Sequence, residues 1–164
     1  MRGNIHVILL IGLGWAQLGW SAIHRWDEEV ELFGKLPGHQ SNPALALGPS
    51  GGYAVWQNVT AKSNGDRVVI HQIDGLLAGR GGPVRLTSDR GRSNETHPRV
   101  ALLAGGGAVV VWESGSRTDR DVMIRFIDAS GQPAGDVAVV NGFKRGNQTR
   151  PDVTVNSAGE VLVV

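Results

Sequence analysis

The stretch NPALALGPSGGYAVWQ, residues 42–57, decides the fold because the chain returns to its pattern twice. The second copy is HPRVALLAGGGAVVVWE at residues 97–113, and the third is RPDVTVNSAGEVLVV at residues 150–164. Each copy has a proline as its second residue, and these are Pro43, Pro98 and Pro151. Their spacings of 55 and 53 residues are typical of the repeats of propeller and solenoid proteins.

Each repeat predicts four short strands rich in β-branched residues. The first strand is expected to start just after the proline, which cannot donate a hydrogen bond to a strand ladder. A glycine-rich hairpin, a polar loop and a turn opened by Asp74 or Asp128 separate the next three strands, and both carboxylates are expected to bond their own turn backbones. The expected strands are residues 44–47, 53–57, 67–73 and 83–86 in the first repeat, and 99–103, 108–113, 121–127 and 136–140 in the second.

Several of these strands are apolar on both faces, as in AVVVW at residues 108–112, so both sides of each small sheet must be covered. Blades stacked face to face around an axis provide that cover. The sequence therefore predicts an all-β protein, a partial β-propeller of about two and a half four-stranded antiparallel blades. The expected segments are blade 1 at residues 43–97, blade 2 at 98–150 and the first half of blade 3 at 151–164, where the chain looks truncated.

The residues ahead of blade 1 divide into a lead-in at 22–42 and an expected signal peptide at 1–21. In the lead-in, EEVEL at residues 28–32 precedes its proline by nearly the same distance as the expected fourth strands do, so it is predicted to be an orphan fourth strand. The signal peptide is predicted from basic Arg2, an apolar run at 5–13 and small residues that allow cleavage after residue 16 or 21.

An apolar run of this length is shorter than the roughly 20 residues that a membrane-spanning helix needs. A buried first strand is the alternative interpretation of the same residues. The signal interpretation predicts a protein that is secreted, periplasmic or on the cell surface.

The repeat resembles a known class. The pattern Asn-Gln-x-x-Pro, an apolar strand, Gly-Gly, VVVWES and RFIDASGQPAGD is similar to the β-propeller repeats of about 50 residues found in large secreted bacterial proteins. The likeness covers residues 28–164 and is closest at 94–140, whereas the first repeat departs from it with Leu77 at the position of Gly131. The resemblance implies export and a scaffold or binding role, without fixing a ligand.

The bulk composition limits the partners. Sixteen Lys and Arg residues against 15 Asp and Glu residues give a net charge of +1, which disfavours nucleic acid and anionic membranes. Cysteine is absent, so stability must come from packing rather than disulfides. The expected partners are further propeller blades, a second copy joined through exposed strand edges, or a carbohydrate or protein ligand.

No residue set points to a catalytic centre or a bound cofactor. GPSGG at residues 48–52 formally fits a serine nucleophile elbow, but it lies between two strands and is expected to be a hairpin. Calcium is a weak candidate because three aspartates lie in the polar loops, and the preferred interpretation of those loops is a solvated turn. The calcium candidates are Asp66, Asp119 and Asp121, and the histidines His39, His71 and His97 are expected at the surface or in loops.

Trp56 and Trp112 end the second strand of each repeat. Exposed, they would form a sugar-stacking platform; buried, they would be packing contacts between blades, which is the preferred interpretation. The expected structural residues of the repeat are Pro43, Trp56, Asp74, Pro98, Trp112, Asp128 and Pro151.

Three functions remain open from the sequence. The first is a non-enzymatic secreted propeller segment that serves as a binding or structural module. The second is a fragment of a propeller-type glycoside hydrolase of the sialidase kind, which would need paired carboxylates. Such sialidases carry a Ser-x-Asp-x-Gly-x-Thr-Trp box, and this sequence lacks it. The third is a truncated reading frame without independent function.

Overall fold

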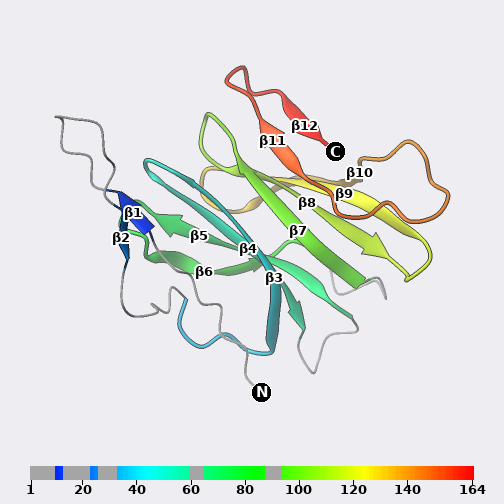
Figure 1. The fold of residues 1–164 in the computed structure, drawn as a ribbon, viewed down its shortest axis with the longest axis horizontal. Helices are drawn as coiled ribbons and strands as arrows, with labels where there is room; N and C mark the ends of the chain where they lie inside the picture. Colours follow the sequence, from blue (N-terminus) through cyan, green and yellow to red (C-terminus); the bar gives the residue numbers. More distant parts are fainter. Residues whose placement is uncertain (1–9, 13–22, 26–32, 60–64, 88–93) are drawn as a thin grey trace.

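The computed structural model describes residues 10–12, 23–25, 33–59, 65–87 and 94–164, and every regular element among them is a β-strand (Figure 1). The first four-stranded sheet contains β3 (His39–Gly48), β4 (Gly51–Val59), β5 (Arg67–Asp74) and β6 (Gly79–Arg85). The second contains β7 (Asn94–Leu102), β8 (Ala108–Gly115), β9 (Arg120–Ile127) and β10 (Pro133–Val139). Two short pairs complete the set, β1 (Leu10–Gly12) with β2 (Ile23–Arg25), and β11 (Val153–Val155) with β12 (Val161–Val163).

The prediction of an all-β partial propeller is confirmed. Strands of each four-stranded sheet are hydrogen-bonded in chain order and antiparallel, so each sheet is a meander like a propeller blade. The first strands of successive sheets are neighbours, because β7 contacts β3 on one side and β11 on the other (Figure 1). The sheets do not close into a ring, and β11 with β12 supplies the half blade.

The first strands begin earlier than predicted, and the prolines lie inside them. β3 and β7 each start four residues ahead of the proline, which occupies a β-bulge where the pairing register shifts. The residue before each proline has a left-handed backbone, with φ of 50° at Asn42, 51° at His97 and 57° at Arg150. A bulge tolerates proline because its extra residue is left out of the ladder, which explains the wrong boundary.

The two aspartate turns are confirmed. Asp74 Oδ1 accepts hydrogen bonds from the backbone N–H of Leu76 and of Ala78, both at 2.9 Å. Asp128 Oδ1 accepts from the N–H of Ser130 at 2.9 Å and from that of Gln132 at 3.0 Å. The same turn requires a left-handed residue at its fourth position, which Gly131 supplies with φ 83° and Leu77 with φ 64°.

One hydrophobic core lies between blades 1 and 2. Most of its buried residues alternate along β4, β5 and β8, and Leu86 after β6 and Ile127 of β9 join them. The full set is Tyr53, Val55, Val68, Ile70, Leu86, Ala108, Val110, Trp112 and Ile127. A second cluster lies on the opposite face of blade 1, where Trp56 packs with Phe33 and Leu36 of the lead-in. Each tryptophan therefore faces the segment that precedes its own blade.

Two predictions concern residues ahead of blade 1. The orphan fourth strand at 28–32 lies outside the described residues. β1 falls within the segment predicted to be a signal peptide, and it pairs with β2. Cleavage after residue 16 or 21 stays a prediction. Among the described residues, no helix is long and apolar enough to cross a membrane.

Candidate functional site

The carboxylate of Glu113, near the end of β8, is a buried polar group with four partners. It is only 2% exposed. Its Oε2 accepts hydrogen bonds from Arg120 Nη1 at 2.7 Å and from Thr96 Oγ at 3.2 Å, and Arg120 also donates to the Thr96 hydroxyl. Its Oε1 accepts from the backbone N–H of Arg150 at 2.8 Å and lies 3.2 Å from His97 Nδ1. Glu113 therefore ties three strands to the start of blade 3.

These contacts keep Glu113 ionised. Burial by itself favours the protonated acid, but four groups outweigh it: the Arg150 N–H, the charge of His97, the Arg120 guanidinium and the Thr96 hydroxyl. The pKa of Glu113 is therefore lowered from its ordinary value. A carboxylate held this way has its acceptor sites occupied, which suits a structural junction better than acid catalysis.

Blade 1 has hydrogen-bonded side chains at the positions that match Glu113, Arg120 and His97. Gln57 matches Glu113 and donates to Asp66 Oδ2, where blade 2 has Arg120. Asn42 Nδ2 donates to Gln57 Oε1 at 2.7 Å, as the matching His97 faces Glu113. The side-chain contacts at these matching positions are therefore kept in both blades while their charges change.

A second buried carboxylate, that of Glu95, accepts a hydrogen bond from the Trp112 indole. Trp112 Nε1 donates to Glu95 Oε2, and Ser114 Oγ donates to Glu95 Oε1 at 3.0 Å. Trp112 is 0% exposed and Trp56 is 1% exposed. Both tryptophans are therefore buried rather than exposed for sugar stacking, and the predicted contact between blades is confirmed for Trp112, whereas Trp56 packs on the lead-in.

His71 corrects another expectation. It was expected at the surface or in a loop, but it lies on β5 with 5% exposure, stacked on Phe33 with ring centroids 4.4 Å apart. Its Nε2 lies 3.2 Å from the backbone oxygen of Gly81, and burial lowers its pKa despite that contact. The error arose because a strand position that packs on the lead-in looks polar in the sequence. His39 is exposed on β3, and His97 is half-buried on β7.

The calcium candidates are not brought together. Asp66 is bonded by Gln57 in blade 1, whereas Asp121 Oδ1 accepts from Asn141 Nδ2 at 2.7 Å in blade 2. Asp119 contributes its backbone oxygen to the loop, which accepts from the Ser116 N–H. No group of three or more metal-ligating side chains occurs in the part of the chain that the structure describes. Ser50 lies in the tight turn joining β3 to β4, so the hairpin interpretation of GPSGG is confirmed.

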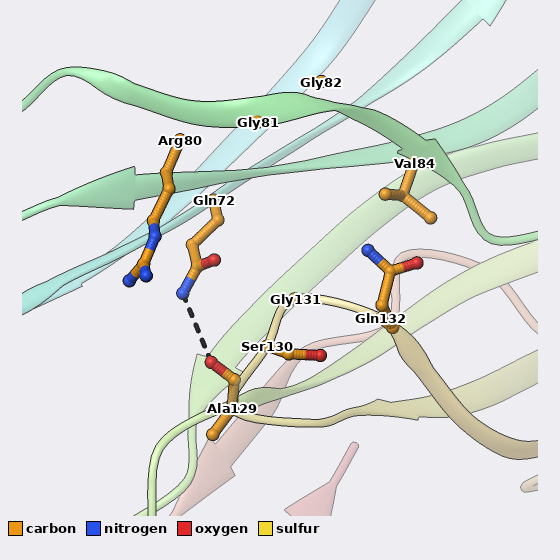
Figure 2. A pocket seen from close by; sticks show the side chains of 9 residues that line it. All are labelled: Gln72, Arg80, Gly81, Gly82, Val84, Ala129, Ser130, Gly131 and Gln132. Atoms are coloured by element: carbon orange, nitrogen blue, oxygen red, sulfur yellow. Dashed lines mark hydrogen bonds between the residues drawn. The ribbon is translucent and has the colours of Figure 1, made fainter.

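A groove lies between blades 1 and 2, at the end that carries the hairpin turns. It consists of two cavities, of about 370 and 380 Å³, that share Gln72, Arg80 and Ala129. Gln72 and Arg80 are cross-strand partners on β5 and β6, and Figure 2 shows both side chains extending toward the turn of blade 2. Gln72 Nε2 donates across the groove to the backbone oxygen of Ala129 at 3.5 Å.

Other polar groups of the groove come from both blades. Ser130 and Gln132 lie on the turn of blade 2 in the first cavity, and Ser50 lies on the hairpin of blade 1 in the second. Tyr53 lines the second cavity and donates its hydroxyl to the backbone oxygen of Asp128 at 3.3 Å, so it also bridges the blades. Burial raises the pKa of Tyr53, which remains a neutral donor.

A further candidate surface is the unpaired edge of β12. Asp152 and Val164 exchange two backbone hydrogen bonds, at 2.9 and 3.0 Å. Bonded pairs alternate in an antiparallel ladder, so Val161 and Val163 turn their N–H and C=O groups away from β11. The matching residues of blade 2, Ala108 and Val110, pair with β9.

Large apolar side chains are exposed on blade 2 and on β12. Phe126 of β9 is 41% exposed, although it shares a face with Val109, which is fully buried. Leu162 on β12 is 60% exposed, and Val139 on β10 is also exposed. Where blade 1 meets blade 2, a full four-stranded sheet covers the face of the blade. The opposite face of blade 2 is followed only by the two strands β11 and β12.

No protein-family model matches the chain, and no curated protein matches it. The fold alone therefore defines the class, a partial β-propeller built from repeated four-stranded blades.

Sequence reasoning found the repeat but missed the roles of Glu95 and Glu113. A signal was present, because each copy has an amide or acid and then a hydroxyl residue shortly before the proline. Arg80 and Gln72 carried no comparable signal, since neither position is repeated: Ala134 and Phe126 stand there in blade 2.

Proposed function

We propose that the chain is a non-enzymatic segment of a secreted β-propeller repeat protein and serves as a binding or structural module. It joins further blades, or a second copy of itself, through the open edge of β12. The observation that carries this proposal is the contrast between β8, which is paired on both sides, and β12, which is paired on one.

The physical argument is the behaviour of unpaired strand edges. Outward N–H and C=O groups of Val161 and Val163 form a template for another antiparallel strand. The exposed apolar side chains of Phe126 and Leu162 give the added strand a surface to cover. A strand like β9 meets both requirements, because β9 covers the matching edge of β8.

The acidic side chains support a non-enzymatic role. A glycoside hydrolase needs two carboxylates that face its substrate. Glu95 and Glu113 are buried and bonded to Trp112, Thr96 and Arg120. They serve as internal contacts of the blade.

Sedimentation velocity of residues 22–164, the expected mature chain, tests the proposal. We expect concentration-dependent association that a peptide with the β9 sequence, RDVMIRFI, suppresses. Val163→Pro should also suppress association, because it removes an outward N–H without touching a bond to β11. The matched control is Leu162→Pro, which removes an inward N–H and should unfold the β11–β12 pair.

A monodisperse wild-type monomer with cooperative unfolding would contradict association through the open edge of β12. Hydrolysis of a glycoside by the purified chain would instead favour the hydrolase alternative.

A further inference from the structure

We propose that the groove between blades 1 and 2 binds an acidic sugar and that the Arg80 guanidinium holds the sugar carboxylate. This inference does not depend on the open edge of β12. It rests on the chemistry of the side chains that meet in the groove.

Arg80 is the only charged side chain among the described residues that line the two cavities. Within the described part of the chain, no ion pair or hydrogen bond engages its guanidinium. The carboxylate of Asp128, next to the lining residue Ala129, is already bonded to its own turn through Ser130 and Gln132. An anion entering the groove therefore meets a positive charge and no lining carboxylate.

The repeat itself provides an internal comparison. Blade 2 has Phe126 at the position of Gln72 and Ala134 at the position of Arg80, and its strands pair in the same way. The blade fold thus does not require an amide and a guanidinium at these positions. Their convergence in one groove needs another explanation, and ligand binding supplies it.

The remaining lining groups suit a polyhydroxylated ligand. The amides of Gln72 and Gln132 and the hydroxyl of Ser50 offer both donors and acceptors. Glycines leave the backbone within reach of the ligand, as at Gly81, where φ is 72°. Each cavity, at about 370 or 380 Å³, is within the size range of small-molecule sites.

A single guanidinium selects the kind of anion. Its planar fork matches a carboxylate in two parallel hydrogen bonds, and one positive charge balances one negative charge. A phosphate group, with a charge of about −1.5 to −2 at neutral pH, is poorly neutralised by one arginine. No exposed aromatic ring lines the groove among the described residues, so affinity rests on hydrogen bonds and one ion pair and is expected in the millimolar range.

Equilibrium dialysis of the full chain against radiolabelled glucuronate tests the proposal, because dialysis tolerates self-association. We expect saturable binding, with glucose at least tenfold weaker. Arg80→Ala should weaken glucuronate binding at least tenfold, and Gln72→Phe, the blade 2 residue, should also weaken it. Arg117→Ala removes the same charge from an exposed loop at the other end of blade 2 and should change binding less than twofold.

Thermal unfolding keeps the test decisive. Because Arg80 is exposed, its variant should unfold at the wild-type temperature, so lost binding reports a lost contact. Absence of glucuronate binding would overturn the proposal. Equal binding by glucose, tighter binding by inorganic phosphate, or unchanged binding by Arg80→Ala would each overturn it as well.

Discussion

The backbone N–H of Arg150 donates a hydrogen bond to Glu113 Oε1 at 2.8 Å, so a carboxylate near the end of β8 in blade 2 holds the residue that leads into blade 3. Arg150 directly precedes Pro151 and has a left-handed φ of 57°. Arg150 lies ahead of β11, which begins at Val153, so its N–H is not used in the β11–β12 ladder and bonds Glu113 instead. In blade 3 the residue before the repeated proline thus supplies a backbone donor that joins the chain to the preceding sheet.

A charge exchange tests this joint. Glu113→Gln leaves Arg120 without its carboxylate and should cost about 1.5–3 kcal/mol, the scale of a hydrogen bond to a charged group. Arg120→Asp places two acids together and should cost more. The double variant rebuilds the Gln57–Asp66 pair of blade 1, so it should be more stable than the sum of the single losses predicts.

Urea unfolding of the four proteins measures the coupling between the two positions. Strict additivity would show that Glu113 and Arg120 do not act as a pair.

Acid should weaken the same joint. The pKa of Glu113 is lowered in the folded chain, because its hydrogen bonds and the nearby charges outweigh burial, so the folded state binds the proton less tightly than the unfolded state does. The stabilisation is therefore complete above the ordinary pKa of 4.5 and is lost as pH falls through the lowered folded value. Urea midpoints measured at successively lower pH should fall less steeply in Glu113→Gln than in the wild type. An identical pH dependence in both proteins would remove Glu113 as the acid-sensitive group.

The blade could be predicted from sequence because its determinants are local. Asp128 bonds the N–H groups two and four residues ahead, and Gly131 takes the left-handed position of the same turn. Such turns recur with the period of the repeat, so the order and number of strands follow from the pattern alone.

Contacts between blades could not be predicted in that way. His71 is polar in the sequence but buried, because Phe33 of the lead-in stacks on it from 38 residues away. Arg80 reaches the groove only because blade 2 packs beside blade 1, and no spacing in the chain encodes that neighbour. Such features depend on tertiary packing, which periodicity does not record.

The buried tryptophan should govern stability rather than ligand binding. Trp112 packs against Tyr53 and Val55 of blade 1, so Trp112→Ala should cost about 3–5 kcal/mol. Trp112→Phe keeps most of the apolar area but removes the N–H that Glu95 accepts, and it should cost about 1–3 kcal/mol. Thermal unfolding separates the two variants. Loss of carbohydrate binding by Trp112→Ala at an unchanged melting temperature would return the residue to the sugar-stacking role.

Substitution by alanine should destabilise the β7–β8 hairpin at Gly107 but not at Gly105. Gly107 has a φ of 81°, and a Cβ added there would lie 2.2 Å from the backbone oxygen of Ile127. Gly107→Ala therefore forces the β8–β9 ladder apart and should cost about 2 kcal/mol or more, since left-handed strain alone costs about 1–2 kcal/mol. Gly51, the matching residue of blade 1, has a φ of 114° and the same 2.2 Å approach to Ile73, so Gly51→Ala should behave alike.

Gly105, two residues before Gly107, is the matched control. Nothing lies within 4 Å of a Cβ added there, so Gly105→Ala should be neutral or slightly stabilising, because alanine restricts the unfolded chain. Urea unfolding of the three variants measures the difference. Equal losses at Gly105 and Gly107 would mean that the hairpin does not hold β8 against β9 in the register described, because only that register places the Ile127 oxygen beneath Gly107.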